Sequence, residues 1–234
     1  MTWASTLAWA DLSPLWLSVR LAAIATGLLL ILGTPLAWWL ARTRSRLKPV
    51  VEAVTALPLV LPPTVLGFYL LILLGPASPP GAFWVELTGQ ALTFSFTGLV
   101  VASVIYSLPF AVQPLQAAFE TIGDSPLEAA ASLRASPVDA FFTIVCPMAF
   151  RGYLTAAILS FAHTIGEFGV VLMVGGNIPG QTRVISIAIY ERVEVLDYAQ
   201  AHTLSLILIG ASLAMLLVVY SLNRRFPAFP GPGR

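Results

Sequence analysis

Five long apolar stretches, separated by shorter polar segments, set the pattern of this chain. A helix needs about 20 apolar residues to cross the hydrocarbon core of a bilayer, and each stretch is long enough. The pattern therefore predicts an all-α membrane protein with about five transmembrane helices in a single transmembrane domain, residues 1–234. The expected spans cover residues 14–41, 49–74, 92–118, 148–174 and 203–222. Residues 119–147 form a charged loop, containing a turn, between the third and fourth spans.

The composition agrees with a membrane location. Hydrophobic residues make up 58% of the chain and charged residues only 10%, whereas a soluble domain carries about 25% charged residues. The net charge of +1 leaves no basic footprint for nucleic acid. A single cysteine, Cys146, excludes an intrachain disulfide and a thiolate metal cluster.

Prolines interrupt the second and third expected spans. They are Pro58, Pro62, Pro63, Pro109 and Pro114. Membrane helices tolerate such breaks where neighbouring helices or water satisfy the freed carbonyl groups, so both segments are kept as spans.

The distribution of arginine and lysine predicts the orientation. Four positive charges crowd the first loop, between Arg42 and Lys48, and none falls in residues 75–91. Arg134 lies in the third loop, and further arginines close the C-terminus. By the positive-inside rule, we expect the N-terminus outside, the C-terminus in the cytoplasm and the 119–147 loop in the cytoplasm.

The 119–147 loop has the features of a short capped helix. Asp124 or Ser125 can cap it, Pro126 suits its first turn, and Glu128 lies where the helix dipole favours a carboxylate. The alanines that follow add little bulk, which lets a helix lie deep in the groove of a partner. The Ser136-Pro137 pair then breaks the run. This pattern alone favours a docking helix and an ordinary solvated loop equally.

The same loop resembles the EAA loop of ABC importer permeases. Glu128-Ala129-Ala130, followed by Ile144 and Pro147, stands at the expected offsets, but Arg134 replaces the glycine usual six residues after the glutamate. The resemblance implies a coupling helix that docks into an ATPase subunit. It assigns coupling to Glu128, Ala129, Ala130, Leu133, Arg134, Ala135 and Ser136.

Further segments resemble the molybdate permeases within that family. They cover residues 57–67, 94–96, 107–110, 166–169 (GEFG) and 176–182 (GNIPGQT). The resemblance implies a bacterial inner-membrane permease of type I (MetI-like) fold that admits molybdate. It also implies a homodimer, two ATP-binding cassette ATPase subunits that hold ATP-Mg, and an external (periplasmic) oxyanion-binding protein. Tungstate and sulfate or thiosulfate stay open as alternative substrates, because all are tetrahedral dianions.

Polar residues within the apolar spans are candidates for the transport path or its gate. Ser160, His163, Thr164 and Glu167 recur at the spacing of one helical face, and a carboxylate in hydrocarbon would cost about 2.5–3.5 kcal/mol. Ser103 and Ser107 form a weaker stripe on the third span. The alternatives are a His163–Glu167 pair across one turn and simple helix packing. Arg20, near the outer end of the first span, can extend to the membrane surface.

The sequence contains no motif of a nucleotide-hydrolysing or other energy-converting domain. No G-x-x-x-x-G-K-[ST] phosphate loop is present, and no catalytic set or metal-ligand spacing appears. We therefore expect a transport subunit without a cofactor of its own rather than an enzyme. A secondary transporter is disfavoured because no internal repeat is visible. Five spans are few to surround an aqueous path, which favours two copies about a twofold axis.

Overall fold

The computed structural model describes residues 12–225, and every regular element in that range is helical. Arg234, counted above among the C-terminal charges, lies outside the described residues. The elements are α2 (Ser13–Arg42), α3 (Lys48–Val60), α4 (Pro63–Leu74), α5 (Pro79–Thr88), α6 (Phe96–Ile122), α7 (Ser125–Ser132), α8 (Pro137–Ala140), the π-helical turn η1 (Phe141–Val145), α9 (Cys146–Met148), α10 (Phe150–Gly166), α11 (Gly169–Gly175), α12 (Ile185–Glu194) and α13 (Tyr198–Arg225).

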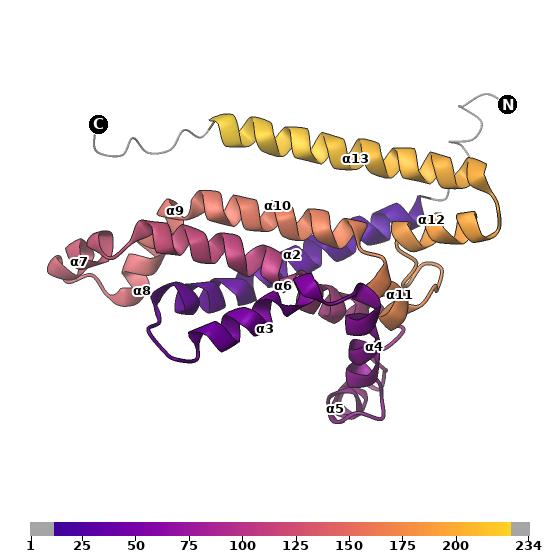
Figure 1. Cartoon of the computed structure of the whole chain (residues 1–234), viewed down its shortest axis with the longest axis horizontal. Coiled ribbons are helices and arrows are strands. Elements are labelled where there is room, and N and C mark those ends of the chain that lie inside the picture. Colours follow the sequence, from indigo (N-terminus) through magenta and orange to yellow (C-terminus); the bar gives the residue numbers. More distant parts are fainter. Residues whose placement is uncertain (1–11, 226–234) are drawn as a thin grey trace.

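Helices α2, α6 and α10 pack against one another and form the body of the molecule (Figure 1). Small residues allow the close approach: a Cβ atom added at Gly152 of α10 would lie 2.4 Å from the Cβ atom of Ala118 of α6. Leu40, Leu115 and Phe119 are fully buried where these helices meet. The hydrophobic effect does not drive helices together within lipid. Close packing of this kind therefore holds a membrane bundle together.

Within residues 12–225, three helices are long and apolar enough to cross a membrane, and two bent helix pairs raise the number to as many as five. The three are α2, α6 and α13, which coincide with the first, third and fifth expected spans apart from shifts of a few residues at their ends. The all-helical fold class is therefore confirmed.

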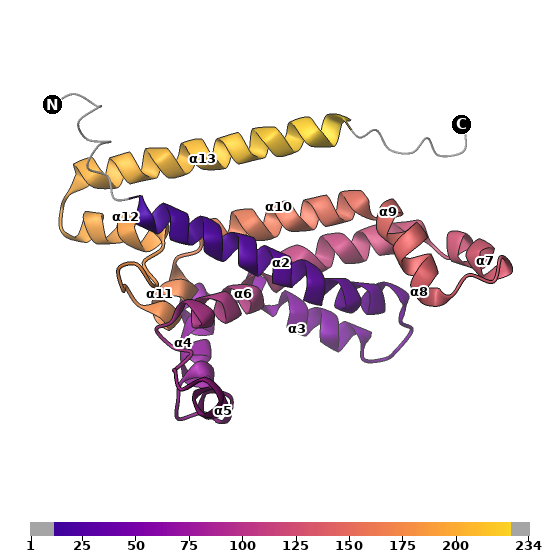
Figure 2. The same cartoon turned by 180° about the vertical axis from the view of Figure 1, so that it is seen from behind.

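The second expected span is not one straight helix. Helices α3 and α4 meet at an angle of 113°, because Leu61 and Pro62 are both extended, with ψ of 137° and 135°. Each of them precedes a proline, which disfavours the helical backbone. As a result α4 and the short α5 project from the bundle as an arm (Figures 1 and 2).

The fourth expected span is also broken. Helix α10 ends at Gly166, Glu167 is extended, with φ of −67° and ψ of 136°, and α11 begins only at Gly169. At its other end α10 meets the α8–α9 segment at a bend of 70°. Residues 148–174 thus contribute one main helix, α10, and, after the break at Glu167, most of the short helix α11.

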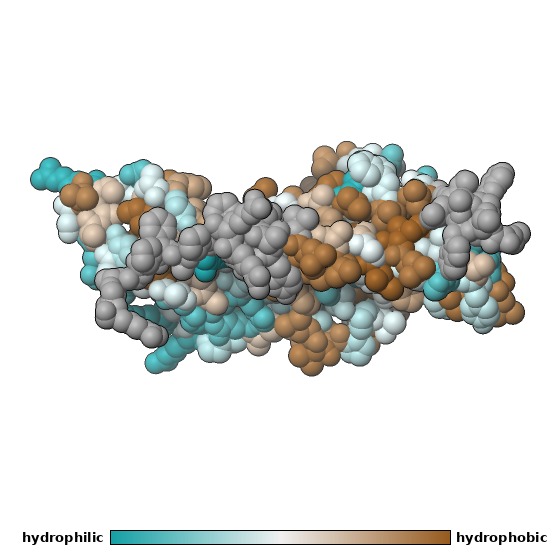
Figure 3. All heavy atoms as spheres, turned by 90° about the horizontal axis from the view of Figure 1, so that it is seen from above, coloured by the Kyte–Doolittle hydropathy of each residue, from teal (hydrophilic) through white to brown (hydrophobic). Residues whose placement is uncertain are grey.

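Helix α13 runs along the bundle on the side opposite the α4–α5 arm, as both ribbon views show (Figures 1 and 2). Seen from that side, apolar residues occupy much of the middle of the molecule (Figure 3). Side chains such as Ile209, Leu213 and Leu217 are exposed, as expected for a helix that faces lipid.

Candidate functional site

A buried polar cluster joins α6 to α10, and Ser107 lies at its centre. The Ser107 hydroxyl oxygen lies 2.8 Å from His163 Nδ1 and 3.0 Å from Thr164 Oγ1. The imidazole ring of His163 also stacks on Phe110, with ring centroids 4.0 Å apart. Hydroxyl and imidazole groups that face each other in this way satisfy their hydrogen bonds away from lipid.

Glu167 lies next to this cluster and is only 5% exposed. The Ser103 hydroxyl donates to Glu167 Oε2 at 3.1 Å, and the backbone carbonyl of Glu167 accepts from the Ser186 hydroxyl of α12. Oε1 of the carboxylate has no hydrogen-bond partner among the described residues. A buried carboxylate with one oxygen unsatisfied is costly to keep, which makes this residue a strong functional candidate.

Two expectations about this helix face need correction. Glu167 does not continue the stripe of Ser160, His163 and Thr164, because α10 ends one residue before it. The two side chains of the proposed His163–Glu167 pair instead bond to different serines of α6. Ser160 is buried, but its hydroxyl has no hydrogen-bond partner among the described residues. The stripe thus separates into a serine-centred cluster, Glu167 and an isolated hydroxyl.

Glu167, His163 and Tyr106 line a cavity of about 600 Å³ between α4, α6, α10 and α11. The remaining lining residues are Pro63, Thr64, Ala162, Gly166, Phe168, Gly169, Leu172 and Met173. No lysine or arginine lines it. Its lining therefore offers hydroxyl, imidazole and carboxylate groups but no fixed positive charge.

The predicted coupling helix is α7, at the far end of the bundle. Glu128 lies in its first turn, Ala130 is buried at 3% exposure and Leu133 is 84% exposed. Asp124 occupies the N-cap position, but its side chain makes no capping hydrogen bond. It forms an ion pair with Arg42 instead, at 2.6 Å.

Arg134 ends α7 with a left-handed backbone, at φ of 60°. The Ala135 N–H donates to the Ala130 carbonyl and the Arg134 N–H donates to the Ala131 carbonyl, which is the hydrogen-bond pattern of a Schellman motif. Arginine thus adopts the conformation for which glycine is favoured, and the turn forms without glycine. Ser136 then caps α8 by accepting from the Asp139 N–H at 3.1 Å.

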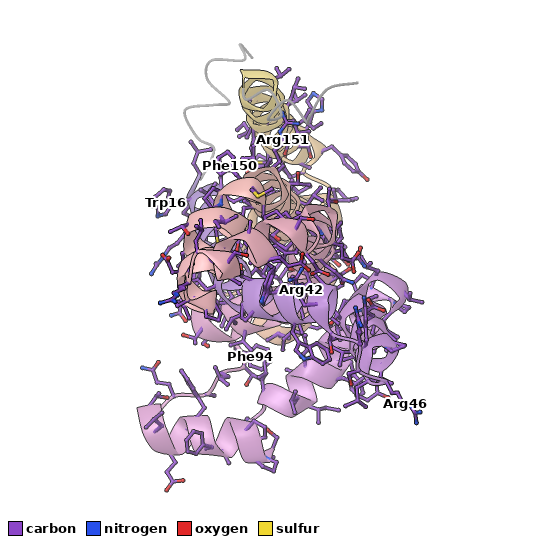
Figure 4. The ribbon with its side chains drawn as sticks, turned by 90° about the vertical axis from the view of Figure 1, so that its left-hand side faces the viewer. Trp16, Arg42, Arg46, Phe94, Phe150 and Arg151 are labelled. Atoms are coloured by element: carbon purple, nitrogen blue, oxygen red, sulfur yellow. The ribbon has the colours of Figure 1, made fainter. Side chains whose placement is uncertain are left out.

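Arg42 connects the coupling region to α2. Besides its ion pair with Asp124, its guanidinium donates to the Gly123 carbonyl at 3.0 Å and lies over the Trp38 ring. Arg42 lies at the end of the bundle in the end-on view, whereas Arg46 points away from the body of the molecule (Figure 4). The sequence placed both arginines in one basic loop and gave no sign of this difference.

Comparison with protein families identifies the chain. Residues 33–228 match the family described as binding-protein-dependent transport system inner membrane component. The chain belongs to this family. It is therefore an inner-membrane transport subunit of an ABC importer, as the EAA resemblance predicted, and the family implies an ATPase and a substrate-binding protein as partners.

Relatives within this family agree over almost the full length. The molybdenum transport system permease protein ModB of Azotobacter vinelandii is 59% identical over 218 residues, covering 93% of this chain and 96% of that protein. ModB of Mycobacterium tuberculosis is 36% identical, covering 96% and 83%. The sulfate transport system permease protein CysT of Synechocystis is 33% identical, covering 87% and 71%.

Solved structures of importers share the fold. A methionine ABC transporter in an inward-facing conformation matches with a TM-score of 0.72 at 16% identity, covering 96% of this chain and 99% of that chain. A bacterial importer of the polysaccharide alginate matches with a TM-score of 0.71 at 15% identity, covering 97% and 84%. The type I importer permease fold expected from the sequence is confirmed.

Proposed function

We propose that this subunit forms the membrane path for molybdate in an ATP-driven importer, working as two identical copies with two ATPase subunits and an external oxyanion-binding protein. The observation that carries the substrate is the 59% identity, over nearly the whole of both chains, to a molybdenum transport permease. The cavity lined by Glu167 carries no fixed cation that would trap an anion on its way through.

Uptake into vesicles tests the substrate. The permease is reconstituted with its ATPase and external protein, ATP is enclosed, and entry of labelled molybdate is followed. Molybdate should accumulate only with ATP, and tungstate should compete because it has the same shape and charge. The sulfate relative makes sulfate the alternative. Accumulation of sulfate, with no competition by molybdate, would contradict the proposal.

Two copies are supported by the exposed apolar surface of the α4–α5 arm. The arm turns away from its own bundle, so its apolar side chains are left uncovered. The exposed ones include Phe68, Tyr69 and Ile72 of α4 and Phe83 of α5. A second copy about a twofold axis would cover such a surface. Native mass spectrometry of the purified complex should give two permease and two ATPase chains, and a single permease chain per complex would contradict this part.

The coupling role is proposed for Glu128, Ala129, Ala130, Leu133, Arg134, Ala135 and Ser136. Its support is geometric: α7 and the turn after it project at one end of the bundle (Figure 1), and most of these side chains are exposed. The exceptions are Ala130, which packs inward, and Ala135, which is half-buried. The segment therefore offers a free surface to an ATPase while staying anchored to the permease.

Glu167 is proposed to keep the path closed to anions until the helices reorient. Its carboxylate lines the cavity and bonds to Ser103 of α6, so a shift of α6 against α10 would move it. Ser107, His163 and Thr164 tie the same two helices together and would move with it. Ser160 lies on the same helix, without a hydrogen bond to this network among the described residues.

The test of the gate compares Glu167→Gln with Ser103→Ala. The amide of Gln can still accept from Ser103 but carries no charge, whereas Ser103→Ala keeps the charge and removes the bond. We expect Glu167→Gln to raise molybdate leak without ATP, and to raise ATP hydrolysis without substrate, several-fold more than Ser103→Ala. Unchanged leak and unchanged coupling in Glu167→Gln would exclude the gate role.

A further inference from the structure

A second polar cavity lies near the N-terminal end of α2, away from Glu167. It has a volume of about 540 Å³, and polar residues from three separate segments line it. They are Arg20, Gln90, Ser95, Thr97 and Gln181. Arg20 carries the only charge among the lining residues, and no carboxylate lines the cavity.

The Arg20 side chain is held in place by an aromatic ring. Its guanidinium lies over the ring of Phe96 at the start of α6, 4.7 Å from the ring centroid. Among the described residues it makes no ion pair. The arginine therefore does not simply extend along its own helix to the membrane surface. It is oriented by a cation–π contact, and no residue in the part of the chain that the structure describes takes up its hydrogen-bond donors.

The GNIPGQT segment builds the opposite wall of this cavity. The Ile178 carbonyl accepts from the N–H groups of Gln181, Thr182 and Arg183, and the Ile178 N–H donates to Thr182 Oγ1 at 3.1 Å. Gly180 takes a positive φ of 73° in the turn. A loop that is fixed by its own hydrogen bonds presents the Gln181 amide to the cavity at little cost in entropy.

The cavity lies on the side of the membrane opposite the coupling helix. Arg20 and Arg42 are both on α2, and 22 helical residues at 1.5 Å each span about 33 Å, close to the thickness of the hydrocarbon core. Arg42 contacts Asp124 beside α7. Arg20 is thus at the end where an external binding protein would release its cargo.

We propose that this cavity, which we call the Arg20 cavity, receives the transported tetrahedral oxyanion as it leaves the external binding protein. The inference rests on the proposed function. One guanidinium facing a dianion, with neutral amide and hydroxyl donors around it, would bind the anion specifically but leave it free to move on. The apolar cluster that contains Leu21, Leu99 and Val171 borders both cavities. Leu17 of this cluster lines the Arg20 cavity. Phe168, which packs against the cluster, lines the cavity beside Glu167.

The experiment uses the complete transporter in vesicles, with labelled molybdate and saturating external protein. Arg20→Gln should lower the amount of molybdate taken up per ATP hydrolysed by about tenfold, the size expected for the loss of a charge-assisted hydrogen bond. The external protein should still half-saturate ATP hydrolysis at the wild-type concentration. Arg20→Lys should retain most uptake, because it keeps the charge.

Arg192→Gln provides the matched control, because it removes the same charge from a helix other than the proposed coupling helix. Arg192 differs from Arg20 in being paired with Asp197. It should transport as the wild type does. Wild-type uptake per ATP in Arg20→Gln would overturn the inference. So would a change confined to the half-saturating concentration of the external protein, since Arg20 would then contact that protein.

The phosphate of a lipid headgroup shares the same chemistry, and vesicle composition separates it from the transported ion. The effect of Arg20→Gln should be equal in phosphatidylcholine vesicles with and without phosphatidylglycerol. An effect present only with the anionic lipid would assign the cavity to a headgroup and overturn the inference. If the wild-type complex itself took up no molybdate, the proposed function would fail instead.

Discussion

The buried cluster around Ser107 and the coupling helix α7 use their polar groups in opposite ways. In the cluster, hydroxyl and imidazole groups bond to one another across α6 and α10, and the neighbouring Glu167 carboxylate bonds to Ser103. In the coupling helix, side chains such as Glu128 and Leu133 are exposed. A substitution in the cluster should therefore change the stability of the subunit. A substitution on α7 should instead change how tightly a partner subunit binds.

The largest expected effect comes from Leu133→Asp. The side chain is 84% exposed, so the fold of the permease should be unaffected, but a charge in the centre of the proposed docking surface would remove an apolar anchor. Loss of such an anchor costs about 2 kcal/mol or more, which corresponds to at least about a thirtyfold weaker ATPase interaction. ATPase co-purification and ATP-driven uptake measure the effect.

Val195→Asp is the control for Leu133→Asp. Val195 is also exposed, at 63%, but follows α12, which lies at the other end of the bundle from α7 (Figure 1). It should leave ATPase co-purification at the wild-type level. Equal losses in both variants would mean that α7 has no special docking role.

A smaller effect, on stability, is expected for Ser107→Ala. The change leaves His163 Nδ1 and Thr164 Oγ1 without their shared partner in a buried place, which costs about 1–3 kcal/mol. The thermal midpoint of the purified complex, followed by tryptophan fluorescence, should fall.

The same substitution in the other region sharpens the comparison. Ser132→Ala on α7 removes only a hydroxyl that donates to the Glu128 carbonyl of its own helix, in an exposed position. Its effect should lie within about 0.5 kcal/mol. If the two serine variants shifted the midpoint equally, the contrast between the buried and exposed regions would be wrong.

A small effect of the opposite sign is expected for Arg134→Gly, which should be stabilising. A left-handed backbone costs a non-glycine residue about 1–2 kcal/mol, and glycine removes much of that cost but gives back some entropy in the unfolded chain. Amide hydrogen exchange at Ala135, whose N–H closes the Schellman motif, should become slower. Faster exchange in Arg134→Gly would show that the arginine side chain stabilises the turn.

The apolar pattern was enough to predict the long apolar helices α2, α6 and α13, because such a helix needs only length and hydrophobicity. It could not predict the direction of the chain at Pro62 and Pro63, since prolines permit a bend without fixing its angle. The break at Glu167 has no proline at all. Gly166 and Gly169 flank it, but its hydrogen bonds come from Ser186, a residue of a later helix, and from Ser103, which no local pattern reports.

The coupling helix was predicted from a resemblance, and its geometry was only partly readable. Glu128 and the alanines indicated a helix because they are local signals. The role of Asp124 depended on Arg42, a residue 82 positions earlier in the chain. The sequence predicts that Arg20 extends to the membrane surface, but it could not show the contact with the ring of Phe96, which belongs to a different helix.

The contacts of Arg42 affect how membrane insertion of this protein can be studied. Charge-reversal experiments treat the arginines of a cytoplasmic loop as equivalent labels of sidedness. Arg42 also connects α2 to the segment before α7, through Asp124 and the Gly123 carbonyl. Replacing it would therefore disturb membrane topology and helix packing at the same time. Arg44 and Arg46 are exposed, and the structure shows neither in an ion pair among the described residues. These two positions can therefore report insertion without loosening the scaffold.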